Sequence, residues 1–281
     1  MSKFTWLSAG ALVLTGLTTF FACSLQNPQV VVGAAARPVG ESSGGSPSFD
    51  AVDHATWDRL LHRYVNEDGM VDYAAWKGNR DDRAALEGYL AKLSSANPEA
   101  PSSKEGKLAF WINAYNALTI HGILAVYPTS SIRNHTAKLF GYNIWDDLLL
   151  PVGGEKYSLN DMEHKILRKL GEPRIHFAIV CASIGCPRLR NEAYVPEKLE
   201  QQLADNTRDF FSRRKNLQVD RASRVVRVSA ILDWFGSDFG PTPQAALASL
   251  SDYMPADAKQ LISSADYSVA FLDYDWSLNK Q

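Results

Sequence analysis

The chain of 281 residues has a net formal charge of −2, with 21% charged and 46% hydrophobic residues. This balance is ordinary for a soluble globular protein. It argues against nucleic acid as the main partner, because phosphate binding requires a basic excess or a basic patch. We interpret the densest basic run, residues 213–215, as the solvated face of a helix.

The N-terminus has the pattern of an export signal. An apolar run at residues 4–22 follows a single lysine and ends with Ala22 directly before Cys23, which is the layout of a secretory signal. A small residue before a cysteine also resembles a bacterial lipoprotein signal, although Phe20 stands where that signal usually has leucine. We expect residues 1–23 to be this signal and the protein to be extracytoplasmic, anchored by lipid in the cell envelope and facing the periplasm. An uncleaved anchor and conventional cleavage stay open.

A change in composition separates the signal from the rest of the chain. Residues 24–49 are rich in Gln, Asn, Pro, Gly, Ser and small residues, which bury too little apolar surface to offset their ordering entropy. We predict a flexible tether there and a single domain at residues 50–281. With Cys23 lipidated or removed, Cys181 and Cys186 are the thiols that remain, in a compartment that does not keep thiols reduced.

Two helices are predicted early in the domain. Apolar residues recur at helical spacing over residues 57–64. The stronger pattern covers residues 102–127, where Ser102 and Glu105 form a capping box and Pro128 marks the end. This second stretch is apolar nearly all round, so we expect it inside the domain.

Three polar residues of that buried helix, Asn113, Asn116 and His121, require partners. A buried amide or imidazole without a partner costs roughly 1–3 kcal/mol. The two amides either tie the helix to neighbouring backbone or bind a ligand. His121 either caps the last carbonyls of the helix or reaches a site.

A hairpin and a further helix follow. Residues 148–157 predict a hairpin that turns at two consecutive glycines, and residues 158–171 predict a helix capped by Ser158. Glu163 and His164 flank the apolar stripe of this helix. Adjacent helix positions point about 100° apart, so the two side chains do not bond directly and each needs another partner.

Within residues 174–183, both alternating sets over positions 175–182 are non-polar apart from His176. This pattern predicts a central strand covered on both faces, with Cys181 at its carboxyl end, a common place for ligands in open sheets. Along a regular strand, His176 and Cys181 lie roughly 16 Å apart. They also face opposite sides of the sheet, which excludes them as a catalytic pair.

The last elements complete the predicted fold. An exposed hairpin is expected at residues 216–228, a short helix at residues 229–240 and a final strand at residues 267–279. Together the elements predict an α/β (α+β) domain with a small, mostly antiparallel sheet packed around a buried central helix.

Five segments resemble, in the same order, the domain of unknown function 547 family, which occurs in bacterial exported proteins and in plant proteins behind a coiled coil. They are residues 110–124 (FWINAYNALTIHGIL), 158–168 (SLNDMEHKILR), 174–190 (RIHFAIVCASIGCPRLR), 231–240 (ILDWFGSDFG) and 272–279 (LDYDWSLN). Some members are distantly similar to papain-like or transglutaminase-like cysteine enzymes. That similarity implies a nucleophilic cysteine at the start of the central helix, where this chain has none.

The two thiols admit three interpretations. Cys181 and Cys186 form a disulfide around a small loop, Cys181 is an activated nucleophile, or both are inert buried thiols. As a nucleophile, Cys181 would need His164 or His121 as its base. The nearby Arg188 and Arg190 would lower its pKa.

The sequence predicts a polar pocket that these residues form together. Candidate catalytic residues are Cys181, His164, Glu163 and His176, and candidate binding residues are Asn113, Asn116, His121, Ser183, Cys186 and Arg188. No metal-ligand spacing or phosphate-binding glycine loop occurs, so we expect no metal and no other cofactor. The leading hypothesis is a cysteine-dependent hydrolase or acyl transferase acting on a peptide-like or thiol-containing small molecule. A non-catalytic envelope binding or scaffolding module and a thiol–disulfide switch are the alternatives.

Overall fold

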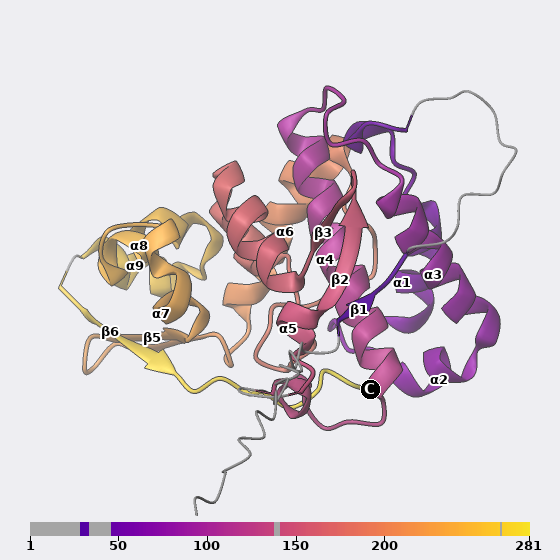
Figure 1. Cartoon of the computed structure of the whole chain (residues 1–281). Helices are drawn as coiled ribbons and strands as arrows, with labels where there is room; N and C mark the ends of the chain where they lie inside the picture. Colours follow the sequence, from indigo (N-terminus) through magenta and orange to yellow (C-terminus); the bar gives the residue numbers. More distant parts are fainter. Residues whose placement is uncertain (1–28, 34–45, 138–140, 265) are drawn as a thin grey trace, which may run out of the picture.

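The computed structural model describes residues 29–33, 46–137, 141–264 and 266–281. The predicted signal, with Cys23, lies outside these residues, as does much of the predicted tether. Two hydrophobic cores organise the described chain. The larger core surrounds one long helix, and the smaller one lies under the orange and yellow elements at one side of the molecule (Figure 1).

The predicted buried helix is α4 (Lys104–Val126), and all of its residues from 106 to 124 except Lys107 and His121 are buried. Its N-cap is Ser103, whose Oγ accepts from the Gly106 N–H, one residue later than predicted. In the part of the chain that the structure describes, α4 is the one helix long and apolar enough to cross a membrane, and 83% of that window is buried inside the protein. This burial is that of a core helix.

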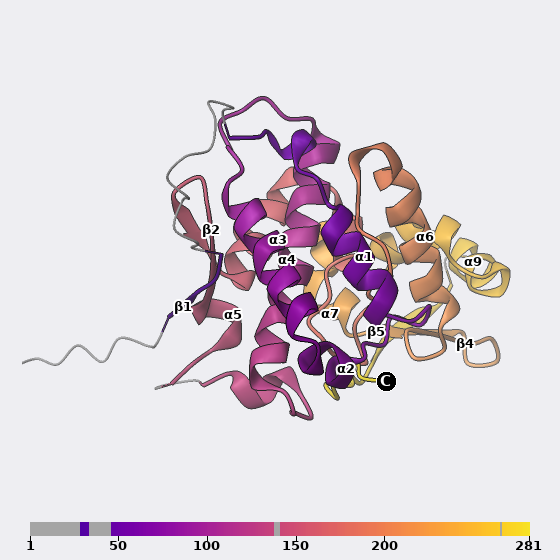
Figure 2. The same cartoon turned by 90° about the vertical axis from the view of Figure 1, so that its right-hand side faces the viewer.

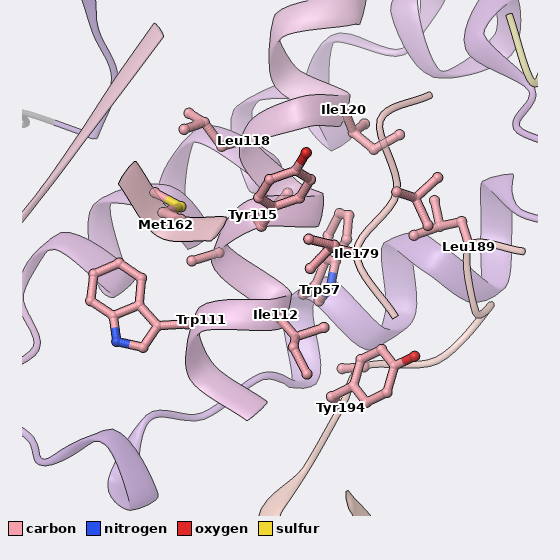
Figure 3. Packing of buried hydrophobic residues seen from close by; sticks show 14 of the residues in the cluster. Trp57, Trp111, Ile112, Tyr115, Leu118, Ile120, Met162, Ile179, Leu189 and Tyr194 are labelled. Atoms are coloured by element: carbon pink, nitrogen blue, oxygen red, sulfur yellow. The ribbon is translucent and has the colours of Figure 1, made fainter. Parts of the chain in front are cut away.

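Three shorter helices, α1 (Ala55–Tyr64), α2 (Tyr73–Gly78) and α3 (Arg80–Ser94), precede α4. Helices α1 and α3 pack beside each other, and α3 contacts α4 (Figure 2). From α4, Ile112, Tyr115 and Leu118 pack into the larger core with Met162 and Ile179 from later segments (Figure 3). The central helix is therefore covered by segments from both halves of the chain.

The first sheet contains β1 (Val30–Val31), β2 (Leu148–Val152) and β3 (Glu155–Tyr157). Strands β2 and β3 form the predicted hairpin, with both turn glycines at positive φ. Strand β1 pairs in parallel with β2, and the following Val32 is buried. This part of the predicted tether is therefore ordered, because three consecutive valines supply apolar surface that the average composition of the segment conceals.

The predicted strand at residues 174–183 is wrong. Pro173–Phe177 form a 3₁₀ helix, and a loop continues from it to Cys186. The segment is buried as expected, but the Asn116 side chain hydrogen-bonds the Ala178 carbonyl and the Val180 N–H in place of a sheet ladder. Periodicity alone does not distinguish a buried strand from other buried backbone.

The segment predicted as one helix at residues 158–171 begins with a π-helical turn (Asp161–Ile166) and ends with a 3₁₀ turn (Leu167–Leu170). Ser158 and Asp161 hydrogen-bond reciprocally at its start, as a capping pair does. A short helix, α5 (Ile144–Asp147), leads into β2.

The smaller core is built by the C-terminal third. Its elements are α6 (Leu199–Ser212), β4 (Leu217–Asp220), β5 (Val225–Ser229), α7 (Ile231–Phe235), α8 (Pro243–Leu250), α9 (Ala256–Ser263) and β6 (Ser268–Leu272). Strands β4 and β5 form the second predicted hairpin, and β6 adds in parallel to β5. After β6 the chain returns to the part of the molecule around the larger core, where Lys280 pairs with Val71 (Figure 1).

The fold class is α/β (α+β), as predicted. It differs in detail, since two mixed three-stranded sheets take the place of one mostly antiparallel sheet. Each sheet consists of a local hairpin and a third strand from a distant segment that pairs in parallel. The two hairpins and the last strand, β6, lie where they were predicted. The two parallel pairings were not predicted, because they join segments that are distant in sequence.

Candidate functional site

A cavity of about 210 Å³ is lined by residues from segments that build the larger core and from segments that build the smaller core. Its lining consists of Tyr115 from α4, Trp145 from α5, Asn160, Glu163 and His164 from the π-helical segment, His176, Ile179, Cys181, Cys186 and Pro187 from the segment after it, Ile231, Trp234 and Phe235 from α7, and Tyr274 and Trp276 near the C-terminus. Thiols, acid and imidazoles from separate elements thus share one cavity.

Two free thiols lie at the centre of this arrangement. The Sγ atoms of Cys181 and Cys186 are 2.9 Å apart, which is longer than the about 2.05 Å of a disulfide bond. The Cys186 sulfur lies 3.0 Å from the Tyr274 hydroxyl and 3.3 Å from the Ser183 hydroxyl. It also accepts the backbone N–H of Cys181 at 3.1 Å. Cys186 is therefore surrounded by hydrogen-bond donors.

The loop between the thiols is held in a tight return. Ala182 adopts a left-handed conformation, with φ of 59°, which costs an L-residue roughly 1–2 kcal/mol. The C-terminal segment offsets this cost, since residues 182–185 form three backbone hydrogen bonds with residues 275–279. A Cβ on Gly185 would lie 2.8 Å from the Tyr274 ring. The glycine thus lets that ring lie on the loop and bring its hydroxyl to the sulfurs.

The two thiols have opposite acidities. Burial acts to raise the pKa of Cys186, but hydrogen bonds from Cys181, Ser183 and Tyr274 outweigh it and lower that pKa. The hydrogen bond that Cys181 donates to Cys186, together with burial, raises the pKa of Cys181. These directions favour the negative charge on Cys186 and the proton on Cys181. Arg188 and Arg190, which were expected to lower a thiol pKa, hydrogen-bond Asn206 and Glu192.

The acid and imidazole of the cavity form a second polar group. Burial raises the pKa of Glu163 to about 7, although the charge of Arg168 acts to lower it. Burial also lowers the pKa of His176 to about 4, against the effect of its 2.9 Å hydrogen bond with Asp238. Arg168 donates two hydrogen bonds to the Asp238 carboxylate. The Phe235 ring stacks on the His176 imidazole. The imidazole is therefore neutral, rigid and engaged on its Nε2 side.

The structure brings together five of the predicted catalytic and binding residues. Glu163, His164, His176, Cys181 and Cys186 all line the cavity. His176 and Cys181 share it because the strand that was expected to separate them is absent. In the part of the chain that the structure describes, no hydrogen bond joins an imidazole to either sulfur. Ser183 contacts both thiols, as a binding residue would.

The other predicted binding residues lie elsewhere. The Asn113 side chain hydrogen-bonds the backbone N–H and carbonyl of Tyr194. The Asn116 side chain hydrogen-bonds the Ala178 carbonyl and the Val180 N–H, so both amides stabilise neighbouring backbone. His121 is not among the cavity residues, and its buried Nδ1 has no hydrogen-bond partner among the described residues. Arg188 bonds Asn206 and pairs with Asp209, away from the thiols.

Sequence reasoning missed the residues that define the site's chemistry. Tyr274 supplies a hydroxyl to both thiols, and Asp238 positions the imidazole of His176. Both belong to segments singled out by the family resemblance, residues 272–279 and 231–240. No spacing along the chain indicates that they reach this cavity.

The fold and the site define a mixed α/β domain that carries a buried dithiol in an aromatic cavity. A model of the family described as "Protein of unknown function, DUF547" matches residues 100–211. The predicted resemblance is confirmed over these residues. The match includes both cysteines and Glu163, whereas Tyr274 and Asp238 lie beyond it. No curated protein and no solved structure matches the chain.

Among the residues that the structure describes, no group of three or more His, Cys, Asp and Glu side chains is placed to hold a metal ion. The site's chemistry is therefore argued from its own side chains.

Proposed function

We propose that the cavity is a site of thiol–disulfide exchange, in which Cys186 attacks as the thiolate and Cys181 resolves. The observation that carries this proposal is the pair of free sulfurs 2.9 Å apart on the wall of a cavity. Its support is the ring of donors around Cys186, because the thiolate is the attacking form in exchange.

The exchange balances with a substrate disulfide as the oxidant. The Cys186 thiolate attacks one sulfur of the substrate, forming a mixed disulfide and releasing the other sulfur as a thiolate. Cys181 then loses its proton and attacks the Cys186 sulfur, so that a Cys181–Cys186 disulfide forms and the second substrate thiolate leaves. Two protein thiols are oxidised and one substrate disulfide is reduced to two thiols. The reverse sequence oxidises a dithiol.

Glu163 is suited to handle the protons of these steps. Its pKa of about 7 keeps it partly protonated near neutral pH, so it is able both to give a proton to a leaving thiolate and to accept one from Cys181. The neutral His176, held by Asp238, lies beside it, with Nδ1 3.9 Å from Glu163 Oε1. In this proposal His176 positions the acid and does not act on sulfur.

Trapping of the mixed disulfide tests the proposal. The full chain with Cys23→Ser is reduced, treated with hydroxyethyl disulfide and examined by mass spectrometry. We expect the parent protein to release both substrate thiols and to gain an internal disulfide. Cys181→Ser should stop at a stable adduct on Cys186, and Cys186→Ser should react far more slowly. Equal reaction of all three proteins, or an adduct that collects on Cys181, would overturn these roles.

Cysteine-dependent hydrolysis or acyl transfer is the second candidate function. The observation in its favour is that Glu163 and His176 share the cavity with the thiols. A nucleophilic thiol requires a base within about 3 Å to 4 Å, whereas the nitrogens of His176 face Asp238 and Glu163. A nitrophenyl ester distinguishes the two functions, because acyl transfer predicts a burst of nitrophenol and repeated turnover. A protein with neither activity would fit a binding or scaffolding module.

We also propose that the domain works outside the cytoplasm, attached to the envelope through lipidated Cys23. Its support is the apolar run before Ala22-Cys23. Outside the cytoplasm no thiol pool holds a dithiol reduced, so a redox partner would set its state. Metabolic labelling with a fatty-acid probe tests the anchor, which Cys23→Ser should abolish.

A further inference from the structure

One wall of the cavity is built from three aromatic rings in mutual contact, and we call Trp234, Tyr274 and Trp276 the aromatic wall. The Trp234 and Tyr274 rings lie 4.9 Å apart, and the Tyr274 and Trp276 rings 4.5 Å apart. Trp234 is 44% exposed although it is a large hydrophobic side chain. At the other end of the wall, the Tyr274 hydroxyl contacts both thiols. The wall therefore leads from the surface directly to the reactive sulfurs.

The charges of the cavity disfavour an anionic ligand. Among the cavity residues that the structure describes there is no lysine or arginine, while Glu163 and Cys186 are both acidic groups. The nearby Arg168 is already paired with Asp238, and Arg133 stands over the Trp276 ring at 5.2 Å. An incoming anion would meet like charges in a partly desolvated space, where repulsion is stronger than in water.

The cavity admits only a compact ligand. Its volume of about 210 Å³ is below the roughly 300–1,000 Å³ of ordinary small-molecule pockets. Cys186 is 3% exposed, so a group must enter the cavity to meet its sulfur. These dimensions fit a small molecule better than the surface of a folded protein.

We propose that the substrate is a small, uncharged disulfide whose flat aromatic or apolar substituent stacks on the aromatic wall while its sulfurs meet Cys186. This inference rests on the proposed exchange function. It goes further by naming the class of disulfide that the cavity selects and by assigning Trp234 to binding. A substituent that stacks on the wall brings the scissile disulfide bond beside the thiols, because the ring of Tyr274 is part of the wall and its hydroxyl contacts both sulfurs.

Three disulfides test the selection. Dithiodipyridine is aromatic and uncharged, dithiobis(nitrobenzoate) is aromatic and dianionic, and hydroxyethyl disulfide is uncharged and not aromatic. The rate of each with the reduced Cys23→Ser chain is divided by its rate with N-acetylcysteine at the same pH, which removes intrinsic reactivity. We expect the ratio to be highest for dithiodipyridine and lowest for the dianion.

Substitution of the wall adds a second readout. Trp234→Ala should lower the dithiodipyridine ratio about two- to tenfold more than the hydroxyethyl disulfide ratio, as expected for loss of one aromatic stacking contact. Phe271→Ala is the matched control, since Phe271 is 39% exposed on β6 and is not among the cavity residues. This control should leave the order of the three ratios unchanged.

The outcomes separate the two proposals. Equal ratios for the three disulfides, or an equal effect of Trp234→Ala on all of them, would overturn the substrate class while exchange itself stands. If none of the disulfides oxidises the protein to an internal disulfide, the exchange function fails first and the substrate class fails with it.

Discussion

The Tyr274 hydroxyl offers the most direct test of the proposed Cys186 thiolate. Its oxygen lies 3.0 Å from the Cys186 sulfur. A hydrogen bond to a charged group contributes about 1.5–3 kcal/mol net, and one pKa unit corresponds to about 1.4 kcal/mol. Tyr274→Phe removes this donor and keeps the ring that packs against Gly185. We therefore expect the pKa of Cys186 to rise by about one to two units.

Alkylation by iodoacetamide across a range of pH measures this shift. The rate follows the thiolate fraction, and peptide mass spectrometry identifies which cysteine has reacted. Tyr267→Phe is the control, because the Tyr267 hydroxyl bonds the Gln244 carbonyl and contacts neither thiol among the described residues. An unchanged midpoint for Tyr274→Phe would refute the view that this hydroxyl stabilises the thiolate. So would an equal shift in the control.

Two further predictions concern stability. The folded-state pKa of Glu163, about 7, lies above its usual value of 4.5. Its contribution to stability is therefore fully present below the unfolded pKa and is lost as the pH rises through about 7, with a total of up to about 3 kcal/mol. The free energy of unfolding of Glu163→Gln, measured with urea between about pH 5 and about pH 8, should lack this loss. The same dependence on pH in the parent protein and in the variant would contradict the prediction. Asn116→Ala leaves the carbonyl of Ala178 and the N–H of Val180 unpaired in the core, which should lower the free energy of unfolding by about 2–4 kcal/mol. A loss below about 1 kcal/mol would mean that water replaces the amide.

Much of the fold is readable from local patterns. The apolar run of α4 predicts its burial, and the glycine pair at 153 and 154 predicts its hairpin, because both depend on residues that are neighbours in sequence. The buried amides of α4 were also recognised as needing partners. The structure supplies backbone partners for Asn113 and Asn116, so their role is packing.

The wrong strand shows where local patterns fail. Most of residues 174–183 are buried as a central strand would be, yet their backbone bonds go to amide side chains such as Asn116 and Asn206. Burial is recorded in the pattern of apolar residues, but the partner of each N–H and carbonyl is not. His176 and Cys181 therefore line one cavity, although the distance along a regular strand had excluded them as a catalytic pair.

By itself the sequence determined the buried central helix, the two hairpins, the mixed class of the fold and the closeness of two thiols across a short loop. Only the tertiary structure decided what surrounds those thiols. Tyr274 is 93 residues from Cys181 along the chain, and Asp238 is 62 residues from His176. Contacts of this kind depend on how separately folded segments pack against one another. No periodicity or spacing within either segment contains that information.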